Sequence, residues 1–140
     1  MVDVLIASDA QTVREEVRAV LEDPSTTVRE VTRGAEVRGA VAERAPDLAV
    51  LDLQIGKMGG MATCLDLRLE EGAGRLPHVP VLMLLDRRAD VFLARRSQAE
   101  GWIVKPFDPM RLARAVAAVL AGGTYEDPTY QPATVPLPAR

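Results

Sequence analysis

Three charged side chains stand where short apolar runs of the sequence end, and together they could transfer a phosphoryl group. They are Asp9 after residues 2–7, Asp52 after residues 48–51, and Lys105 after residues 101–104. If the runs are parallel strands, their carboxyl ends lie at one edge of a sheet, where the three side chains can converge. Two carboxylates in one pocket suit Mg²⁺, with water as the remaining ligands. A metal and an ammonium beside Asp52 would stabilise a transferred phosphoryl group, so Asp52 could be its nucleophilic acceptor.

Strands and helices alternate along the chain and supply the positions of these residues. Apolar and β-branched runs predict five strands, at residues 2–7, 26–31, 48–51, 80–85 and 101–104. Segments of helical period predict five helices, at residues 13–21, 35–44, 61–69, within 87–98 and at 109–120. Strict alternation of this kind predicts an α/β fold, a doubly wound parallel sheet with helices on both faces.

The last predicted helix has clear start and stop signals, and the chain changes character after it. Asp108 is a good N-cap with Pro109 in the first helical position, and Gly122-Gly123 closes the helix. Prolines then recur at positions 128, 132, 136 and 138 without a packing pattern. We therefore expect one folded domain over residues 1–122 and a flexible, proline-rich tail over residues 123–140.

The composition indicates one globular domain. The chain has 140 residues, of which 26% are charged, and its net charge of −3 argues against non-specific nucleic-acid binding. Cys64 is the single cysteine, so it cannot form an internal disulfide, and we expect a small buried hydrophobe in a reducing compartment. The chain starts directly with a strand and has no apolar run of about 18 residues. We expect a cytoplasmic protein with neither signal peptide nor membrane span.

Several short motifs resemble the receiver domain of bacterial two-component response regulators. They are Asp9 after the first strand, Pro46-Asp47-Leu48-Ala49-Val50-Leu51-Asp52, Met58 followed two residues later by Gly60, and Lys105-Pro106-Phe107 after the fifth strand. The resemblance covers about residues 2–120. It implies a flavodoxin-like five-stranded sheet with the strand order 2-1-3-4-5.

The resemblance also assigns roles to the charged residues. It implies that Asp52 is the phosphoacceptor, that Lys105 binds the phosphoryl group, and that Asp9, Asp52 and the backbone carbonyl of Gln54 hold Mg²⁺. The family usually has a cis peptide bond at the Lys-Pro step, here Lys105-Pro106. Asp9 could instead cap the first helix, and Lys105 could be a solvated lysine, but the complete set favours the pocket. Beyond self-catalysed phosphorylation and dephosphorylation of Asp52, we expect no enzymatic activity.

Three positions depart from the family and make this an atypical receiver. Ser8 stands where a second acidic residue is usual, so Mg²⁺ should bind more weakly. Leu85 stands where a threonine or serine hydroxyl bonds to the phosphoryl group and triggers the switch, a bond that leucine cannot make. Asp86 replaces a small residue, and its carboxylate would repel a phosphodonor or partly replace the missing metal ligand. Trp102 occupies the aromatic switch position, but without the hydroxyl its rotamer can be uncoupled from phosphorylation.

Four arginines around the fourth helix predict a partner surface. Arg87, Arg88, Arg95 and Arg96 could form a solvated face or, because the family meets partners through its fourth helix, fifth strand and fifth helix, a docking surface. The resemblance implies that a histidine kinase or a phosphotransfer protein supplies the phosphoryl group. The output protein is not identified by the sequence, and homodimerisation is left open.

Three functions remain in competition. About twenty residues follow Leu120, too few for a DNA-binding domain, so we expect a stand-alone receiver that signals through protein contacts and does not bind DNA itself. The alternative is a pseudo-receiver, an interaction module that works without phosphorylation, which Ser8, Leu85 and Asp86 favour. A small doubly wound enzyme or a flavin-binding protein is the third, but no glycine-rich phosphate loop follows the first strand.

Overall fold

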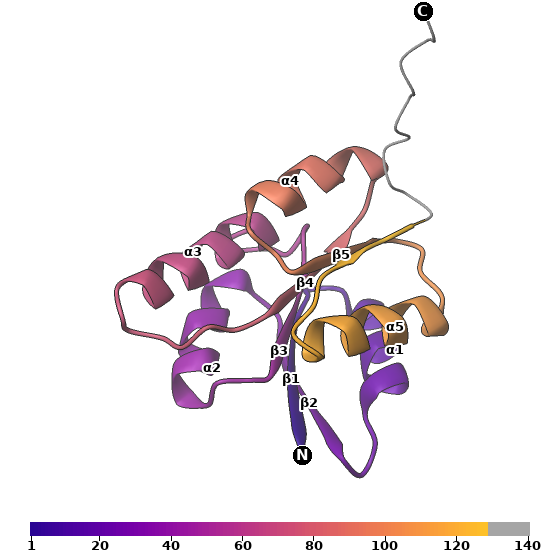
Figure 1. The fold of residues 1–140 in the computed structure, drawn as a ribbon, viewed down its shortest axis with the longest axis horizontal. Coiled ribbons are helices and arrows are strands. Elements are labelled where there is room, and N and C mark those ends of the chain that lie inside the picture. Colours follow the sequence, from indigo (N-terminus) through magenta and orange to yellow (C-terminus); the bar gives the residue numbers. More distant parts are fainter. Residues whose placement is uncertain (129–140) are drawn as a thin grey trace, which may run out of the picture.

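Parallel strands form a single sheet with helices on both faces (Figure 1). The structure is a computed structural model that describes residues 1–128, so prolines 132, 136 and 138 of the predicted tail lie outside the described residues. The strands are β1 (Val2–Ala7), β2 (Thr26–Val31), β3 (Leu48–Asp52), β4 (Val81–Leu85), β5 (Gly101–Val104) and β6 (Tyr125–Glu126). The helices are α1 (Gln11–Leu21), α2 (Val37–Glu43), α3 (Gly60–Gly72), α4 (Val91–Arg96) and α5 (Pro109–Leu120), with short 3₁₀ turns at Gly34–Glu36 and Arg88–Asp90.

The sheet confirms the predicted strand order and adds one strand to it. The order is β2-β1-β3-β4-β5-β6, and each neighbouring pair is parallel. The prediction of five strands was wrong by one, because Tyr125 and Glu126 pair with β5 although they belong to the predicted tail. A strand of two residues is too short to show an alternation of apolar and polar residues in the sequence. Its contacts with β5 hold it in place. The predicted domain boundary at residues 122 and 123 stays a prediction.

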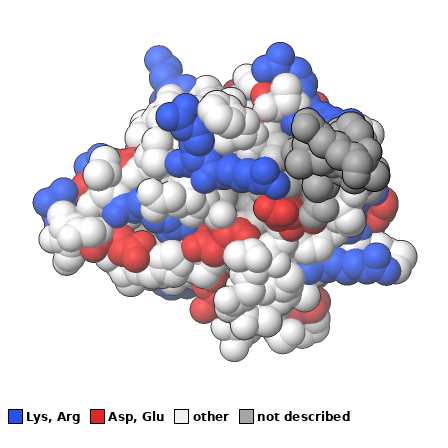
Figure 2. Space-filling view, turned by 45° about the horizontal axis from the view of Figure 1, so that its top comes forward, with Lys and Arg blue, Asp and Glu red and all other residues white. Residues whose placement is uncertain are grey.

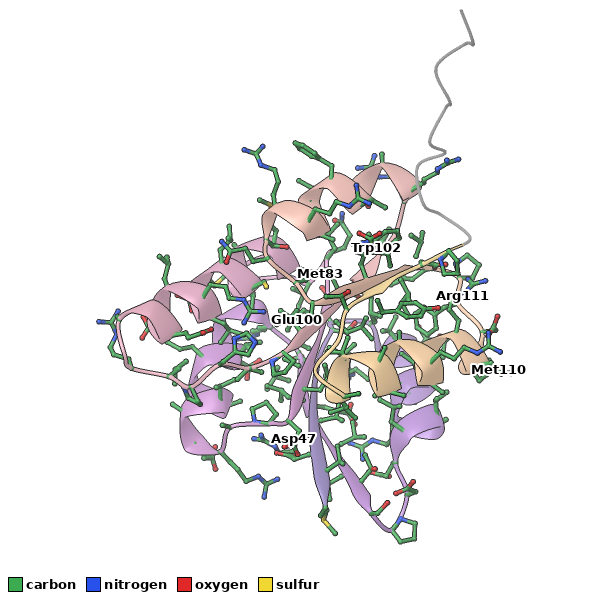
Figure 3. All side chains as sticks on the ribbon, viewed as in Figure 1. Asp47, Met83, Glu100, Trp102, Met110 and Arg111 are labelled. Carbon is green, nitrogen blue, oxygen red and sulfur yellow. The ribbon has the colours of Figure 1, made fainter. Side chains whose placement is uncertain are left out.

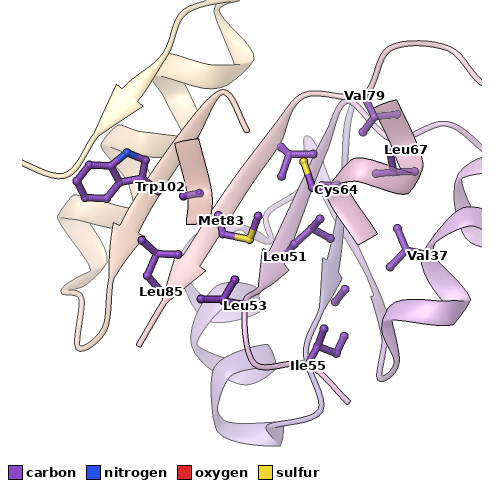
Figure 4. Packing of buried hydrophobic residues seen from close by; sticks show 14 of the residues in the cluster. Val37, Leu51, Leu53, Ile55, Cys64, Leu67, Val79, Met83, Leu85 and Trp102 are labelled. Atoms are coloured by element: carbon purple, nitrogen blue, oxygen red, sulfur yellow. The ribbon is translucent and has the colours of Figure 1, made fainter. Parts of the chain in front are cut away.

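Each face of the sheet has its own hydrophobic cluster. Every residue of β3 and β4 is buried, as expected for central parallel strands that helices cover on both sides. Helices α1 and α5 pack on one face through residues such as Val17 and Leu112. Helices α2, α3 and α4 pack on the other, where Val37, Cys64 and Ala94 meet the strands (Figure 4). Among the described residues, no helix has both the length and the apolar character needed to cross a bilayer.

The helix starts agree with the local chemistry of the sequence in one case and not in another. The side chain of Asp108 accepts a hydrogen bond from the backbone N–H of Arg111 at 2.7 Å, so it caps α5 as predicted, with Pro109 in the first turn. Helix α1 instead begins after Ala10, without a capping side chain. Asp9 therefore does not cap α1, and the alternative prediction that it caps the first helix is wrong.

Gly60 allows α3 to begin directly behind the end of β3. A Cβ atom at this position would lie 2.6 Å from the carbonyl oxygen of Asp52 and 2.8 Å from the Cα of Leu53. Both are backbone atoms, so neither can rotate away. The glycine of the Met58-x-Gly60 motif is therefore required by the close approach of the helix to the strand that carries Asp52.

Substituting Gly60 should test this close approach. We expect Gly60→Ala to lower the free energy of unfolding by about 1–3 kcal/mol, because backbone must shift to admit the methyl group. The matched control is Gly39→Ala in α2, where a Cβ meets nothing within 4 Å. That change should be neutral or stabilising by up to ~1 kcal/mol, since it removes conformational freedom from the unfolded chain. Urea unfolding of both variants measures the difference, and equal midpoints would contradict the steric argument.

Candidate functional site

The carboxyl ends of four neighbouring strands bring the predicted polar residues together. Asp52 is the last residue of β3, and Ser8, Asp86 and Lys105 follow β1, β4 and β5. Because β1, β3, β4 and β5 are adjacent in the sheet, these residues reach one pocket from loops that are distant in sequence. The convergence predicted for Asp52 and Lys105 is present, and the peptide bond between Lys105 and Pro106 is cis.

Asp52 is a buried carboxylate with a polar partner on each oxygen. Its residue is only 2% exposed. One carboxylate oxygen, Oδ1, accepts a hydrogen bond from the Lys105 ammonium at 2.8 Å and from the backbone N–H of Gln54 at 3.3 Å. The other, Oδ2, accepts from the Ser8 hydroxyl at 2.8 Å. A buried carboxylate is tolerated when a counter-charge and hydrogen bonds replace its water, and Asp52 has both.

Ser8 takes part in this arrangement as a fixed hydroxyl. The residue is fully buried, and its Oγ accepts a hydrogen bond from the backbone N–H of Ala10 at 3.1 Å while it donates to Asp52. The Arg14 guanidinium donates to the Ser8 carbonyl at 2.8 Å. Ser8 is therefore a neutral group that holds the Asp52 carboxylate in one orientation.

Lys105 lies between two carboxylates rather than beside one. Its Nζ is 2.8 Å from Oδ1 of Asp52 and 3.2 Å from Oδ1 of Asp86. Burial disfavours its charged form, but the hydrogen bonds and charges of Asp52 and Asp86 outweigh that effect and raise the pKa of Lys105 above its ordinary value. The Asp86 carboxylate thus occupies one side of the ammonium that would face a phosphoryl group.

Asp9 is placed against the loop that follows β3. Its Oδ2 accepts a hydrogen bond from the backbone N–H of Gly56 at 3.0 Å, and a Cβ at Gly56 would lie only 3.2 Å from that oxygen. Asp9 is exposed, whereas Asp52 is buried. Of the three predicted residues, two are thus in direct contact, and the third holds the loop beside them.

The donor set of the pocket fits a magnesium ion that keeps several waters. No group of three histidine, cysteine, aspartate or glutamate side chains capable of holding a metal occurs within residues 1–128. The carboxylates of Asp9 and Asp52 are oxygen donors of the kind that Mg²⁺ takes. Mg²⁺ is commonly held by one or two carboxylates and completes its octahedron with water. Ser8 contributes no charge, so the ion would be held less strongly than by three carboxylates.

The two switch positions are both packed in the hydrophobic core. Leu85 is fully buried, and Trp102 is 2% exposed in the same cluster, where it lies between β5 and α4 (Figure 3). The indole Nε1 of Trp102 is buried and has no hydrogen-bond partner. Buried donors without partners are costly, by about 1–3 kcal/mol, so the position of this indole has a cost in stability.

The four arginines around α4 are all exposed, and several of them contact neighbouring residues. Arg87 donates to the buried Asp90 at 3.1 Å, and Arg95 is 3.2 Å from Glu126 of β6. The guanidinium of Arg96 lies over the ring of Phe92, 5.1 Å from its centroid, and Phe92 is 60% exposed. Figure 2 shows lysine and arginine side chains gathered on the face that carries α4. This face therefore presents an exposed aromatic ring among cations.

Sequence reasoning missed one fully buried charge, Asp127. Its side chain accepts a hydrogen bond from the backbone N–H of Val104 at 3.1 Å, yet it follows a polar dipeptide in the predicted tail. No pattern in the sequence distinguishes it from a solvated aspartate. Cys64 was predicted correctly as a buried residue, and burial raises the pKa of its thiol to about 11.

The fold and this pocket define a class of signalling domain. The chain matches the response regulator receiver domain family over residues 4–117, and it belongs to that family. Solved structures with the same fold include CheY4, a chemotaxis response regulator of Vibrio cholerae, at a TM-score of 0.75 and 25% identity over 85% of this chain and 98% of that one. A two-component response regulator of the LuxR family from Aurantimonas gives a TM-score of 0.79 and 26% identity over 91% of each chain.

Curated relatives are longer proteins. The DNA-binding response regulator MtrA of Mycolicibacterium paratuberculosis is 33% identical over 119 residues, which are 84% of this chain and 50% of MtrA. The transcriptional regulatory protein GltR of Pseudomonas aeruginosa is 31% identical over 84% of this chain and 48% of GltR. The chain thus spans about half the length of the curated relatives it matches, and the similarity covers its receiver domain.

The pairing of Lys105 with Asp86 should appear in the pH dependence of stability. A raised pKa of Lys105 contributes stability that is complete below about pH 10.4, its ordinary value, and is lost as the pH rises through the value in the folded chain. Asp86→Asn removes one of the two carboxylates. We expect this variant to be less stable by about 0.5–1 kcal/mol at pH 7 to 9, because Asp86 is partly exposed and the pair is screened.

The difference should shrink above about pH 10.4, since the neutral amine no longer attracts Asp86. Urea unfolding at a series of pH values measures it, with Glu43→Gln at the exposed end of α2 as a control for the loss of one negative charge. Equal stability of Asp86→Asn and Glu43→Gln between pH 7 and 9 would show that the contact of Asp86 with Lys105 does not contribute to stability.

Proposed function

We propose that this chain receives a phosphoryl group on Asp52 and passes the signal on through protein contacts. The single observation that supports this most is the pairing of the buried Asp52 carboxylate with the Lys105 ammonium at 2.8 Å, at the end of the central strand β3. Receiver domains act in two-component signalling and interact with histidine kinases. A histidine kinase or a phosphotransfer protein is therefore the expected phosphodonor for this chain.

The chemistry is a phosphoryl transfer that the pocket assists by charge and position. A carboxylate oxygen of Asp52 forms a bond to the phosphorus as the bond to the donor breaks, and the donor keeps the electron pair of that bond. Lys105 stabilises the added negative charge, while the Ser8 hydroxyl and the Gln54 N–H keep the carboxylate oriented. Magnesium, held by Asp9, Asp52 and the Gln54 carbonyl, would neutralise further charge on the phosphoryl oxygens. Water later attacks the phosphorus and restores the free carboxylate.

The output would not follow the hydroxyl-dependent switch of the family. Leu85 has no group that can bond to the phosphoryl oxygens, and Trp102 is already packed inside the core. What phosphorylation changes directly is the partner of Lys105, which would exchange the Asp86 carboxylate for the phosphoryl group. The signal would then pass through the loop between β4 and α4 to the surface with Arg87, Arg88, Arg95 and Arg96.

Phosphorylation of Asp52 can be tested by intact mass. The chain is incubated with Mg²⁺ and a small phosphodonor such as acetyl phosphate, alongside Asp52→Asn. We expect a gain of one phosphoryl group on the parent and none on the variant, because an amide is not a nucleophile for this reaction. The fluorescence of Trp102, the one tryptophan of the chain, is recorded in parallel. A folded parent that gains no phosphoryl group with excess donor and metal would contradict the proposal.

A pseudo-receiver, which binds partners without phosphorylation, is the second candidate. It is favoured by the Asp86 carboxylate, which lies 3.2 Å from the Lys105 ammonium and fills the side that a phosphoryl group would need. Leu85 adds to this, because a phosphoryl group would find no hydroxyl at the end of β4. In that case the role of these polar residues would be structural, since they pair with one another at the carboxyl edge of the sheet.

Asp86→Asn distinguishes the two candidates. If Asp52 is a working acceptor, removing the competing carboxylate should raise the rate of phosphorylation by acetyl phosphate on the order of tenfold, since one like charge near an incoming anion is worth about 1–2 kcal/mol after screening. Intact-mass time courses at fixed Mg²⁺ give the rate. A pseudo-receiver predicts no phosphorylation of either chain.

The partners of this chain are proposed as proteins. The relatives MtrA and GltR are named as a DNA-binding and a transcriptional regulator, and this chain covers only about half of each. We propose that the receiver domain itself, with its net charge of −3, does not bind DNA. Its stand-alone operation, its cytoplasmic location and any homodimer stay predictions.

A further inference from the structure

The outer edge of β5 is closed by the chain's own C-terminal residues. Helix α5 carries the chain from β5 back to a parallel position beside it, so β5, α5 and β6 form a crossover unit (Figure 1). Without β6, the apolar strand Gly101–Val104 would present unpaired N–H and C=O groups at the sheet edge. We call residues 124–128 the C-terminal strap.

Backbone pairing and one side chain hold the strap on β5. The N–H of Tyr125 donates to the carbonyl of Glu100 at 3.1 Å, and Gly101 and Trp102 pair with Tyr125 and Glu126. Beyond the last pair, the N–H of Val104 donates to the Asp127 carboxylate at 3.1 Å. A side chain thus takes the place of the next carbonyl of the ladder.

The strap also carries its acidic groups to arginines on both flanking helices. Asp127 is fully buried and its Oδ1 lies 3.6 Å from Nε of Arg111 on α5, which Figure 3 shows beside the end of β6. Glu126 is 3.2 Å from Arg95 on α4 and remains half exposed. The edge of β5 therefore offers backbone hydrogen-bonding groups and a buried site for a carboxylate. The strap lies between two cations, Arg95 on α4 and Arg111 on α5.

We propose that this edge is a docking site for an extended acidic segment of a partner protein, and that the strap occupies it in cis until the partner displaces it. The requirement is a short extended segment with an aspartate in the position of Asp127, because that carboxylate satisfies both the Val104 N–H and the Arg111 guanidinium. Recognition would be by strand addition, in which the backbone supplies affinity and the aspartate supplies selectivity.

The strap is built so that it can be displaced. It pairs with β5 through only two residue pairs, and Gly122 and Gly123 join it to the end of α5, with Gly122 at a φ of +86°. The tether gives the strap an effective concentration at the edge of β5 that is roughly millimolar. A partner segment that binds this edge more tightly than the strap does can therefore displace it. This inference does not depend on phosphorylation of Asp52.

The experiment uses the full chain with Asp127→Asn and a peptide of residues 123–128, Gly-Thr-Tyr-Glu-Asp-Pro. By NMR, we expect the Val104 amide of the variant to exchange with solvent about tenfold faster than in the parent, because it loses a charge-assisted hydrogen bond. The peptide should shift the Gly101 and Val104 amides of the variant at roughly millimolar concentration, and those of the parent only at several times that concentration. A peptide with asparagine in place of the aspartate should bind at least about tenfold more weakly.

Glu126→Gln is the matched control, since it removes one negative charge from the same strap at an exposed position. It should leave exchange at Val104 close to that of the parent. Circular dichroism establishes that both variants are folded. The proposal is overturned if Val104 exchanges alike in parent and Asp127→Asn, if the peptide shifts no β5 amide, or if both peptides bind equally. A dimer of the loosened variant by light scattering would show that a second copy is the occupant, and would also overturn it.

Discussion

The structure of the candidate site depends on one constraint, that the buried carboxylate of Asp52 must be paired. The Asp52 residue is only 2% exposed, so its charge requires a cation and hydrogen bonds close by. Lys105, Ser8 and the Gln54 N–H provide them from three separate loops. Only a parallel sheet that places β1, β3 and β5 with their carboxyl ends at the same edge brings these loops together. Gly60 belongs to the same constraint, because a Cβ at this position would lie only 2.6 Å from the carbonyl oxygen of Asp52, so glycine lets α3 begin directly behind the strand.

The substitutions at the pocket change the partners of that charge while they preserve its burial. Ser8 supplies a hydrogen bond where the family has a further carboxylate, and Asp86 supplies a carboxylate where it has a small side chain. Lys105 is therefore shared between two anions, Asp52 and Asp86. Leu85 places no polar group at the end of β4, and the buried indole N–H of Trp102 has no hydrogen-bond partner.

The opposite side of β5 shows how an additional strand can alter a signalling surface without altering the site. The strap covers the outer edge of β5 and contacts α4 and α5 through Arg95 and Arg111. These are the elements through which receivers generally meet partners, according to the resemblance seen in the sequence. Any partner at this edge would have to compete with the strap, so availability of the surface would be governed by a local equilibrium as well as by phosphorylation.

The sequence by itself determined the fold class and the convergence of Asp52 with Lys105, because apolar runs, their spacing and the residues at their ends are local features. The strand order and the departures at Ser8, Leu85 and Asp86 came from the resemblance to receiver domains, since no local pattern shows which strands are neighbours or which residues are unusual. The tertiary structure decided that Asp9 holds Gly56 rather than caps α1, that Lys105 is shared with Asp86, and that Trp102 lacks a hydrogen-bond partner. It alone revealed β6 and the buried Asp127. Tyr125, Glu126 and Asp127 show no periodicity in the sequence. Their position is fixed by the edge of β5 and by Arg95 and Arg111, which lie elsewhere in the chain.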